Sequence, residues 1–204
     1  MINENNIRWV ETFAFSLEKY TDLREVYERY YHLNKEKLSC QMQYLHLLIK
    51  ERNFDVTGKH ALTIYKGTKD HKFMFFSILS NFIKITETEK EEDIPKKLMI
   101  VNLFLDKIVK ELKIVDSATV ESRDLHKNIV MLKTRTLLKQ KETEKALAWV
   151  EQYKKFYEKE MRMGKVLAEV YAIDPSDVNY YRLVNYQREF IITNTTLDSF
   201  EFQH

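Results

Sequence analysis

Apolar residues recur every three to four positions along most of the chain, which is the spacing of one helix face. In the stretch IRWVETFAFSLEKY this spacing places Trp9, Phe13 and Leu17 on a single side. Phe15 does not fit, because it falls on the opposite side among polar neighbours. The first predicted helix therefore has an ordinary core face and one surplus aromatic residue on its back.

The same periodicity predicts a series of further helices. They cover residues 21–33, 36–52, 70–85, 96–115, 117–140 and 142–159, followed by a shorter one ending at 173 and a last one after the Asp-Pro break at 174–177. Residues 53–68 lose the pattern between Gly58 and Gly67, so a loop with a short helix is predicted there. The acidic stretch TETEKEED, residues 86–93, is predicted to be a solvated linker.

Two of the predicted helices indicate how the helices pack against one another. The helix over 96–115 is apolar on nearly every side, so we predict that other helices surround it, with Pro95 in its first turn. The helix over 142–159 carries one core stripe: Ala146, Trp149, Val150, Tyr153 and Tyr157.

Composition agrees with an all-helical fold. Only three Gly and two Pro occur in 204 residues, which leaves little material for hairpins or phosphate-binding loops. No predicted linker is long enough to separate domains. We therefore predict one all-α domain over residues 1–204, with eight or nine helices.

Charge and cysteine usage narrow the possible partners and the compartment. Lys and Arg number 33 against 31 Asp and Glu, a balance that argues against a dedicated nucleic-acid surface. A single cysteine, Cys40, excludes an intramolecular disulfide and favours a reducing compartment. No signal-peptide pattern or membrane-length apolar stretch is present, so a soluble intracellular protein with no membrane contact is expected.

The sequence offers no pattern of catalytic chemistry. The histidines, among them His46, His60, His71 and His126, are scattered without the paired spacing of metal ligands. Cys40 lacks a neighbouring glycine-rich oxyanion turn, and the carboxylates interleave with Lys as they do on exposed helix faces. We predict no catalytic residues, no cofactor and no metal, and hence no enzyme.

Aromatic residues are unusually abundant, with 12 Tyr, 12 Phe and 2 Trp. They fit the edges of a helical core, and they also fit a partner interface, where they provide large contact areas. For most of them the core interpretation is favoured. For Phe15, on the wrong side of its helix, the interface is the better explanation.

One segment partly matches a tetratricopeptide (TPR) motif. The stretch EKALAWVEQYKKFYEKEMRMGKVLAEVYAIDPSD ends in Asp-Pro as that repeat does. Alignment on Pro175 leaves Glu151 and Met163 at positions that the motif reserves for small residues. No second copy is visible one period upstream, so the match is incomplete.

Several blocks resemble a different family, the telomere-repeat-factor homology (TRFH) domain. RWVETFAF resembles that domain's first helix, DLREVYERYYHL its second, VES the start of its long central helix, and KQKETEKALAWV the junction that follows. The residues that match the first block are Arg8, Trp9, Val10, Phe13 and Phe15. Residues 53–93 depart from the family, and its Myb-type DNA-binding domain is absent from this chain.

The TRFH resemblance implies an all-α horseshoe or bundle that homodimerises through its first two helices and its last one. It also implies docking of short partner peptides, a nuclear location at chromosome ends, and contact with telomeric DNA only through segments absent here. Peptide-groove residues fall in the divergent region and cannot be assigned. The dimer-interface residues predicted on this basis are Trp9, Phe13, Phe15, Tyr27, Tyr30 and Tyr31.

Three hypotheses follow. The leading one is a non-enzymatic dimerisation and protein-docking domain of a telomere-associated, shelterin-like protein. The alternative is an unrelated helical adaptor or scaffold, TPR-like, that binds a peptide or another subunit. The third and weakest is an enzyme with a helical core.

Overall fold

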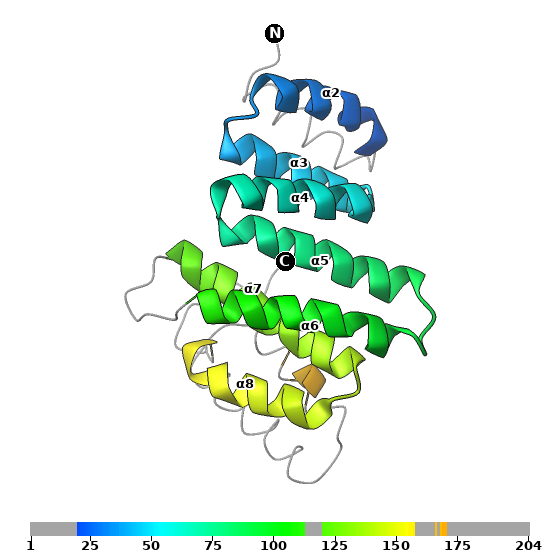
Figure 1. The fold of residues 1–204 in the computed structure, drawn as a ribbon, viewed down its shortest axis with the longest axis vertical. Helices are drawn as coiled ribbons and strands as arrows, with labels where there is room; N and C mark the ends of the chain where they lie inside the picture. The colour runs from blue at the N-terminus through cyan, green and yellow to red at the C-terminus, as the bar shows by residue number, and fades with distance from the viewer. Residues whose placement is uncertain (1–19, 113–119, 158–165, 167, 171–204) are drawn as a thin grey trace, which may run out of the picture. The chain divides into compact units, whose positions relative to one another are not determined.

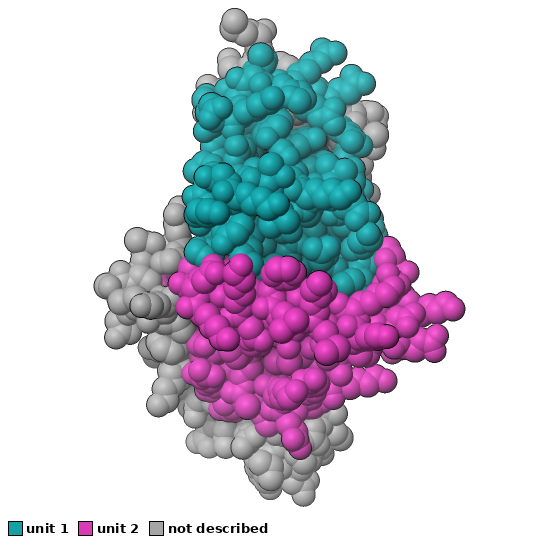
Figure 2. Space-filling model, viewed as in Figure 1, with its two compact units in different colours: residues 1–87 teal, residues 88–204 magenta. Residues whose placement is uncertain are grey.

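The described part of the chain is entirely helical. The computed structural model describes residues 20–112, 120–157, 166 and 168–170, and these contain seven helices, α2 to α8, and no strand. The prediction of an all-α fold is confirmed. The chain divides into two compact units, residues 1–87 and 88–204, which Figure 2 colours separately. The single domain over residues 1–204 stays a prediction.

Unit 1 is a series of four helices, which follow one another through the unit in Figure 1. They are α2 (Tyr20–Leu33), α3 (Leu38–Lys50), α4 (Phe54–Thr68) and α5 (His71–Thr88), whose last residue lies just past the unit boundary. Apolar side chains from α3, α4 and α5 form one buried cluster: Leu45, Ala61, Ile64, Phe73 and Phe76. Burial of this cluster contributes to the hydrophobic stabilisation of the unit.

The predicted loop at residues 53–68 is wrong, because this segment is the helix α4. Gly58 lies where α4 packs against α5. A Cβ built there would lie 3.9 Å from both the Ser77 carbonyl oxygen and Ser80 Cβ, which is ordinary van der Waals contact. Gly67 also lies within the helix. Two glycines that were interpreted as breakers are therefore helical residues.

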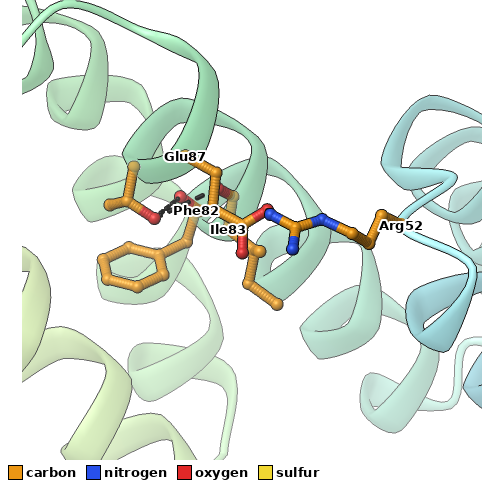
Figure 3. Close-up of polar contacts among 5 residues, drawn as sticks. Arg52, Phe82, Ile83 and Glu87 are labelled. Carbon is orange, nitrogen blue, oxygen red and sulfur yellow. Dashed lines mark hydrogen bonds and ion pairs between the residues drawn. The ribbon is translucent and has the colours of Figure 1, made fainter.

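The predicted linker at residues 86–93 is wrong in its first part, since α5 continues through Thr88. The Thr86 hydroxyl donates to the carbonyl oxygens of Phe82 at 3.0 Å and Ile83 at 3.1 Å. Glu87 pairs with Arg52, with 2.6 Å between Oε2 and Nη2 (Figure 3). This exposed ion pair contributes at most about 1 kcal/mol, and it joins the end of α5 to the turn between α3 and α4.

Three interhelical turns place a basic residue in the left-handed backbone region, where glycine is the usual choice. Arg52, Lys69 and Lys141 have φ values of 60°, 59° and 63°. They lie between α3 and α4, between α4 and α5, and between α7 and α8. The scarcity of glycine in this chain therefore does not prevent tight helical hairpins.

Two of these turns have the same hydrogen bonds, those of a Schellman motif. After α7, the Glu142 amide donates to the Leu137 carbonyl and the Lys141 amide to the Leu138 carbonyl, each at 3.0 Å. After α3, the Asn53 and Arg52 amides donate to the Leu48 and Ile49 carbonyls in the same order, at 2.9 and 3.0 Å. The two hairpins, one in each unit, thus share one turn design.

An aromatic cluster in unit 1 surrounds His60. The Tyr31 and Tyr44 rings stack with centroids 4.9 Å apart. The His60 ring meets both edge-on, at 4.9 Å from Tyr31 and 5.4 Å from Tyr44. Burial lowers the pKa of His60, because the charged imidazolium is poorly solvated there. His60 is therefore held in its neutral form.

Unit 2 contains α6 (Ile94–Glu111), α7 (Val120–Lys139) and α8 (Thr143–Tyr157). Pro95 lies in the first turn of α6, as predicted. Helix α7 packs against both α6 and α8. A second buried cluster joins α7 and α8 to residues further along the chain: Val130, Val150, Tyr153, Val166 and Val170.

The prediction that other helices surround the apolar helix α6 is wrong. Four of its large side chains are exposed: Met99 at 59%, Ile100 at 57%, Leu103 at 67% and Phe104 at 45%. The helix packed on two sides is α7, although it is more polar. Its buried threonines, Thr134 and Thr136, donate to carbonyls one turn earlier in the same helix, each at 2.8 Å. Polar side chains satisfied in this way can be buried at little cost.

We expect Lys141→Gly to stabilise unit 2. A left-handed conformation costs an L-residue about 1–2 kcal/mol, while glycine loses about 0.5–1 kcal/mol more backbone entropy on folding. The net gain in the free energy of unfolding is therefore about 0.5–1 kcal/mol, measured by urea unfolding.

The control for this substitution is Lys139→Gly, two residues earlier in the last turn of α7. Lys139 has no left-handed backbone to relieve, so glycine there should destabilise by about 0.5–1 kcal/mol. A loss of stability in both variants would contradict the account of the turn.

Acid should destabilise the protein in part through His60. Its folded-state pKa lies below the unfolded value, so the unfolded chain binds the proton more tightly. Stability is then complete at neutral pH and falls as pH drops through the unfolded pKa of about 6.5. Urea unfolding of the wild-type chain and of His60→Gln, from neutral to mildly acidic pH, should show a smaller loss in the variant. Equal losses in the two chains would contradict this assignment.

Candidate binding cleft

A cleft of about 570 Å³ in unit 2 is lined by residues of α6, α7 and α8. Each of these helices contributes one face, with residues spaced by three and four positions. The lining residues are Met99, Asn102, Leu103 and Asp106 from α6, Lys133, Leu137 and Gln140 from α7, Glu142 from the turn, and Lys145, Ala148, Trp149 and Gln152 from α8. The cleft is therefore a product of three helices meeting.

Lys133 connects the three helices of the cleft. It is 8% exposed, and its ammonium group forms an ion pair with Asp106 of α6. The same Nζ lies 4.0 Å from the centre of the Trp149 ring on α8, within cation–π range. Trp149 is itself fixed, because its Nε1–H donates to the Val130 carbonyl at 3.2 Å.

Two side-chain oxygens that are covered in the cleft region have no hydrogen-bond partner, Asn102 Oδ1 and Gln140 Oε1. The orientation of the Gln140 amide is fixed, because its Nε2 donates to the Pro95 carbonyl at 3.3 Å. A carbonyl oxygen can only accept a hydrogen bond, so Gln140 Nε2 must face the Pro95 carbonyl, and Gln140 Oε1 has no partner. Unsatisfied covered acceptors are rare in folded proteins and require an explanation.

The charged residues of the cleft neutralise one another. Lys133 pairs with Asp106, and Lys145 pairs with Glu142 at 2.6 Å between Nζ and Oε2. Two cations and two carboxylates give the lining a formal charge of zero. The cleft therefore favours an uncharged ligand over a strongly acidic or basic one.

The exposed apolar face of α6 continues from the cleft. Met99 and Leu103 belong to the cleft wall, and Ile100 and Phe104 stand next to them on the same helix. Met99 and Leu103 are four residues apart, and so are Ile100 and Phe104. The four side chains therefore form two adjacent rows along the helix. Contiguous exposed apolar surface of this kind marks interaction sites.

The lining residues do not form a catalytic arrangement. Among the described residues that line the cleft there is no histidine, cysteine or serine, and both carboxylates, Asp106 and Glu142, are ion-paired. Nucleophilic or acid–base catalysis needs a nucleophile and a base within hydrogen-bond reach. Across the described residues, no three His, Cys, Asp or Glu side chains gather as a metal site would require. The arrangement is suited to binding.

None of the predicted dimer-interface residues is among the described residues that line the cleft. Trp9, Phe13, Phe15 and the side chain of Tyr27 fall outside the described part of the chain. Tyr30 is 2% exposed and belongs to the core of unit 1. Tyr31 is half-buried in the aromatic cluster around His60. The interface role of all six residues stays a prediction.

The cleft itself was not predicted from the sequence. Trp149 was assigned to a core stripe, and it is only partly buried, with one side against Lys133. The available signal was a mixed apolar and amide stripe on α6, and a similar one on α8. Such stripes become informative only when the helices are known to be neighbours.

Comparison with known proteins identifies a helical repeat. Residues 1–170 match the family model described as "Psidin, N-terminal TPR repeats region", a range that includes all of α2 to α8. No curated protein and no solved structure gave a match. None of the described helices is both long and apolar enough to cross a bilayer. The match does not bear on the TRFH resemblance, which stays a prediction. It agrees with the alternative hypothesis of a TPR-like helical adaptor or scaffold. The chain belongs to the family of psidin N-terminal TPR repeat regions.

Proposed function

We propose that this protein is a non-catalytic helical-repeat scaffold that binds a partner protein on unit 2. The observation that carries the proposal is the exposed apolar face of α6, formed by Met99, Ile100, Leu103 and Phe104. Stacked helical repeats commonly use an extended surface of this kind to bind proteins. The TPR family and the neutral cleft beside the face both support an adaptor.

Burial of the exposed α6 face against a partner would be energetically favourable. Removing one large apolar side chain from water contributes about 1.5–3 kcal/mol when burial is complete. Met99 and Leu103 are more than half exposed, so much of this free energy is still available to a partner. Aromatic side chains such as Phe104 are frequent anchors at the centre of protein interfaces. A partner with a complementary apolar surface would therefore bind here.

Two finer statements from the sequence remain proposals. One is homodimerisation through aromatic residues of the first 31 positions, and the other is action at telomeres in the nucleus. They rest on the TRFH resemblance, and the described contacts are silent on both. A scaffold that binds a different protein accounts for the exposed α6 face without either of them.

The homodimer proposal has a direct test in Phe15→Ala. If Phe15 contacts a second copy, sedimentation at micromolar concentration should show a dimer for the wild-type chain and weaker association for the variant. Helical content measured by circular dichroism should be unchanged. A wild-type chain that sediments as a monomer across this range would overturn the homodimer.

The scaffold proposal is tested by photocrosslinking from the α6 face. We expect benzoylphenylalanine at position 103, in cells that express the chain, to give a discrete crosslinked partner. Benzoylphenylalanine in place of Leu62, which is exposed on α4 of unit 1, is the matched control and should not yield that product. The captured partner should bind the purified chain directly.

Charge on the same face provides the second arm of this test. Leu103→Glu with Phe104→Glu should reduce the affinity for the captured partner by about tenfold or more, since interface anchors contribute at least about 2 kcal/mol. Val56→Glu with Leu62→Glu, both on exposed α4 positions, should leave it unchanged. Equal effects of the two double variants, or identical crosslinking from both positions, would overturn the proposal.

A further inference from the structure

We propose that the exposed face of α6 binds an amphipathic helix of the partner, whose apolar residues are flanked at both ends by acidic residues. This inference rests on the proposed function and specifies the partner of the same surface. It is carried by the apolar patch of Met99, Ile100, Leu103 and Phe104 and by the lysines that lie beyond each end of that patch.

Exposed lysines flank the apolar patch along the helix axis. Lys96 lies one turn before the patch and Lys107 one turn after it, so helical periodicity places both on the exposed side of α6. Neither has an ion-pair partner among the residues that the structure describes. The neighbouring Lys97, by contrast, pairs with Glu89. The charges of Lys96 and Lys107 are therefore available to a partner.

The α6 face is positively charged, although the cleft beside it is neutral. Lys110 adds a third exposed lysine, three positions after Lys107, and Glu111 adds one carboxylate at the end of the helix. Three lysines and one glutamate give the exposed side a formal charge of +2. A partner with acidic residues beyond both ends of its apolar contact is therefore attracted, and a basic partner is repelled.

This charge pattern disfavours a second copy of the chain as the occupant. If two α6 helices paired antiparallel about the middle of the patch, Lys96 of one copy would face Lys107 of the other. If they paired in parallel, each lysine would face its own equivalent. Like charges that face each other across an interface are unfavourable, so both arrangements oppose self-association.

A helical ligand suits the patch better than an extended one. The four side chains of the patch, from Met, Ile, Leu and Phe, offer no strong hydrogen-bond donor or acceptor. An extended segment pressed against them would lose water from its backbone N–H and C=O groups without gaining partners. In a helix these groups are already paired with one another. Two apolar rows on α6 also match the ridges of side chains on a second helix.

The partner helix should repeat the pattern of α6 with the charges reversed. On α6 the two flanking lysines are eleven positions apart, close to three helical turns, with apolar residues three, four, seven and eight positions after the first. We expect acidic residues at the same separation on the partner, with apolar residues at those positions between them. Because the pattern has one charge at each end, it fits α6 in either direction.

The experiment titrates the full chain into two labelled helical peptides of eighteen residues. Both carry leucine at the four central contact positions and the same lactam bridges on the opposite side, which make them equally helical. One has glutamate at the two flanking positions and the other has lysine. Fluorescence anisotropy should show about tenfold tighter binding of the glutamate peptide. The difference should shrink as salt is added, because salt screens exposed charges.

Charge reversal on the chain should reverse this preference. Lys96→Glu with Lys107→Glu should bind the lysine peptide about tenfold more tightly than the glutamate peptide. The matched control is Lys59→Glu with Lys66→Glu, at exposed positions of α4 in unit 1, which changes the net charge equally. It should keep the preference of the parent chain. Circular dichroism should show unchanged helical content in both variants.

Equal affinities for the two peptides would overturn this inference and leave the scaffold proposal standing. The same holds if neither peptide binds while position 103 still crosslinks to its partner. Failure of both the crosslinking and the peptide titration would overturn the two proposals together.

Two other occupants of the face are also outcomes of the test, and both use Leu103→Glu with Phe104→Glu. A dimer of the parent chain in sedimentation that this variant abolishes would assign the face to a second copy. Binding of the parent chain, but not of this variant, to vesicles of phosphatidylserine and phosphatidylcholine would assign it to a membrane surface if neither peptide binds. Either result would overturn the acidic helix as the occupant.

Discussion

The ammonium group of Lys133 links the three described helices of unit 2. It carries a charge at a position that is 8% exposed, so the charge must be compensated within the fold. Asp106 on α6 and the Trp149 ring on α8 provide that compensation, and both contact the same Lys133 Nζ. The register of all three helices is therefore coupled to one side chain. A slip of any helix would leave a charge buried without its partner.

This constraint explains why a polar helix is the one packed on two sides. Helix α7 buries Thr134 and Thr136 through bonds within its own backbone, and Lys133 through its neighbours. Helix α6 needs only one apolar face to pack on α7, and Leu98, Val101 and Leu105 provide it. Its second apolar face, formed by Met99, Ile100, Leu103 and Phe104, is exposed in the described structure. The hydrophobic content of α6 exceeds what the described fold buries, and that excess is the basis of the proposed partner surface.

Hydrophobic periodicity was sufficient to predict features that depend on one helix alone, such as where that helix lies in the sequence. It located α3, α5, α6 and α8 to within a few residues, because their apolar stripes are continuous. It failed at α4, since Gly58 was interpreted as a breaker while the real turn residues, Arg52 and Lys69, are basic. It also failed on the environment of α6, because composition does not reveal which face a neighbour covers. The cleft was out of reach for the same reason, since its residues come from three helices.

A repeat protein makes this surplus surface understandable. Each helical hairpin buries only part of its apolar surface by itself, and neighbouring hairpins cover the rest. Each unit contains one hairpin with the same turn design, at Arg52 in unit 1 and at Lys141 in unit 2. The exposed apolar face of α6 beside a neutral cleft is the surface on which we propose that another chain binds. The fold and its proposed function thus follow from one deficit, apolar and polar groups that the chain does not satisfy alone.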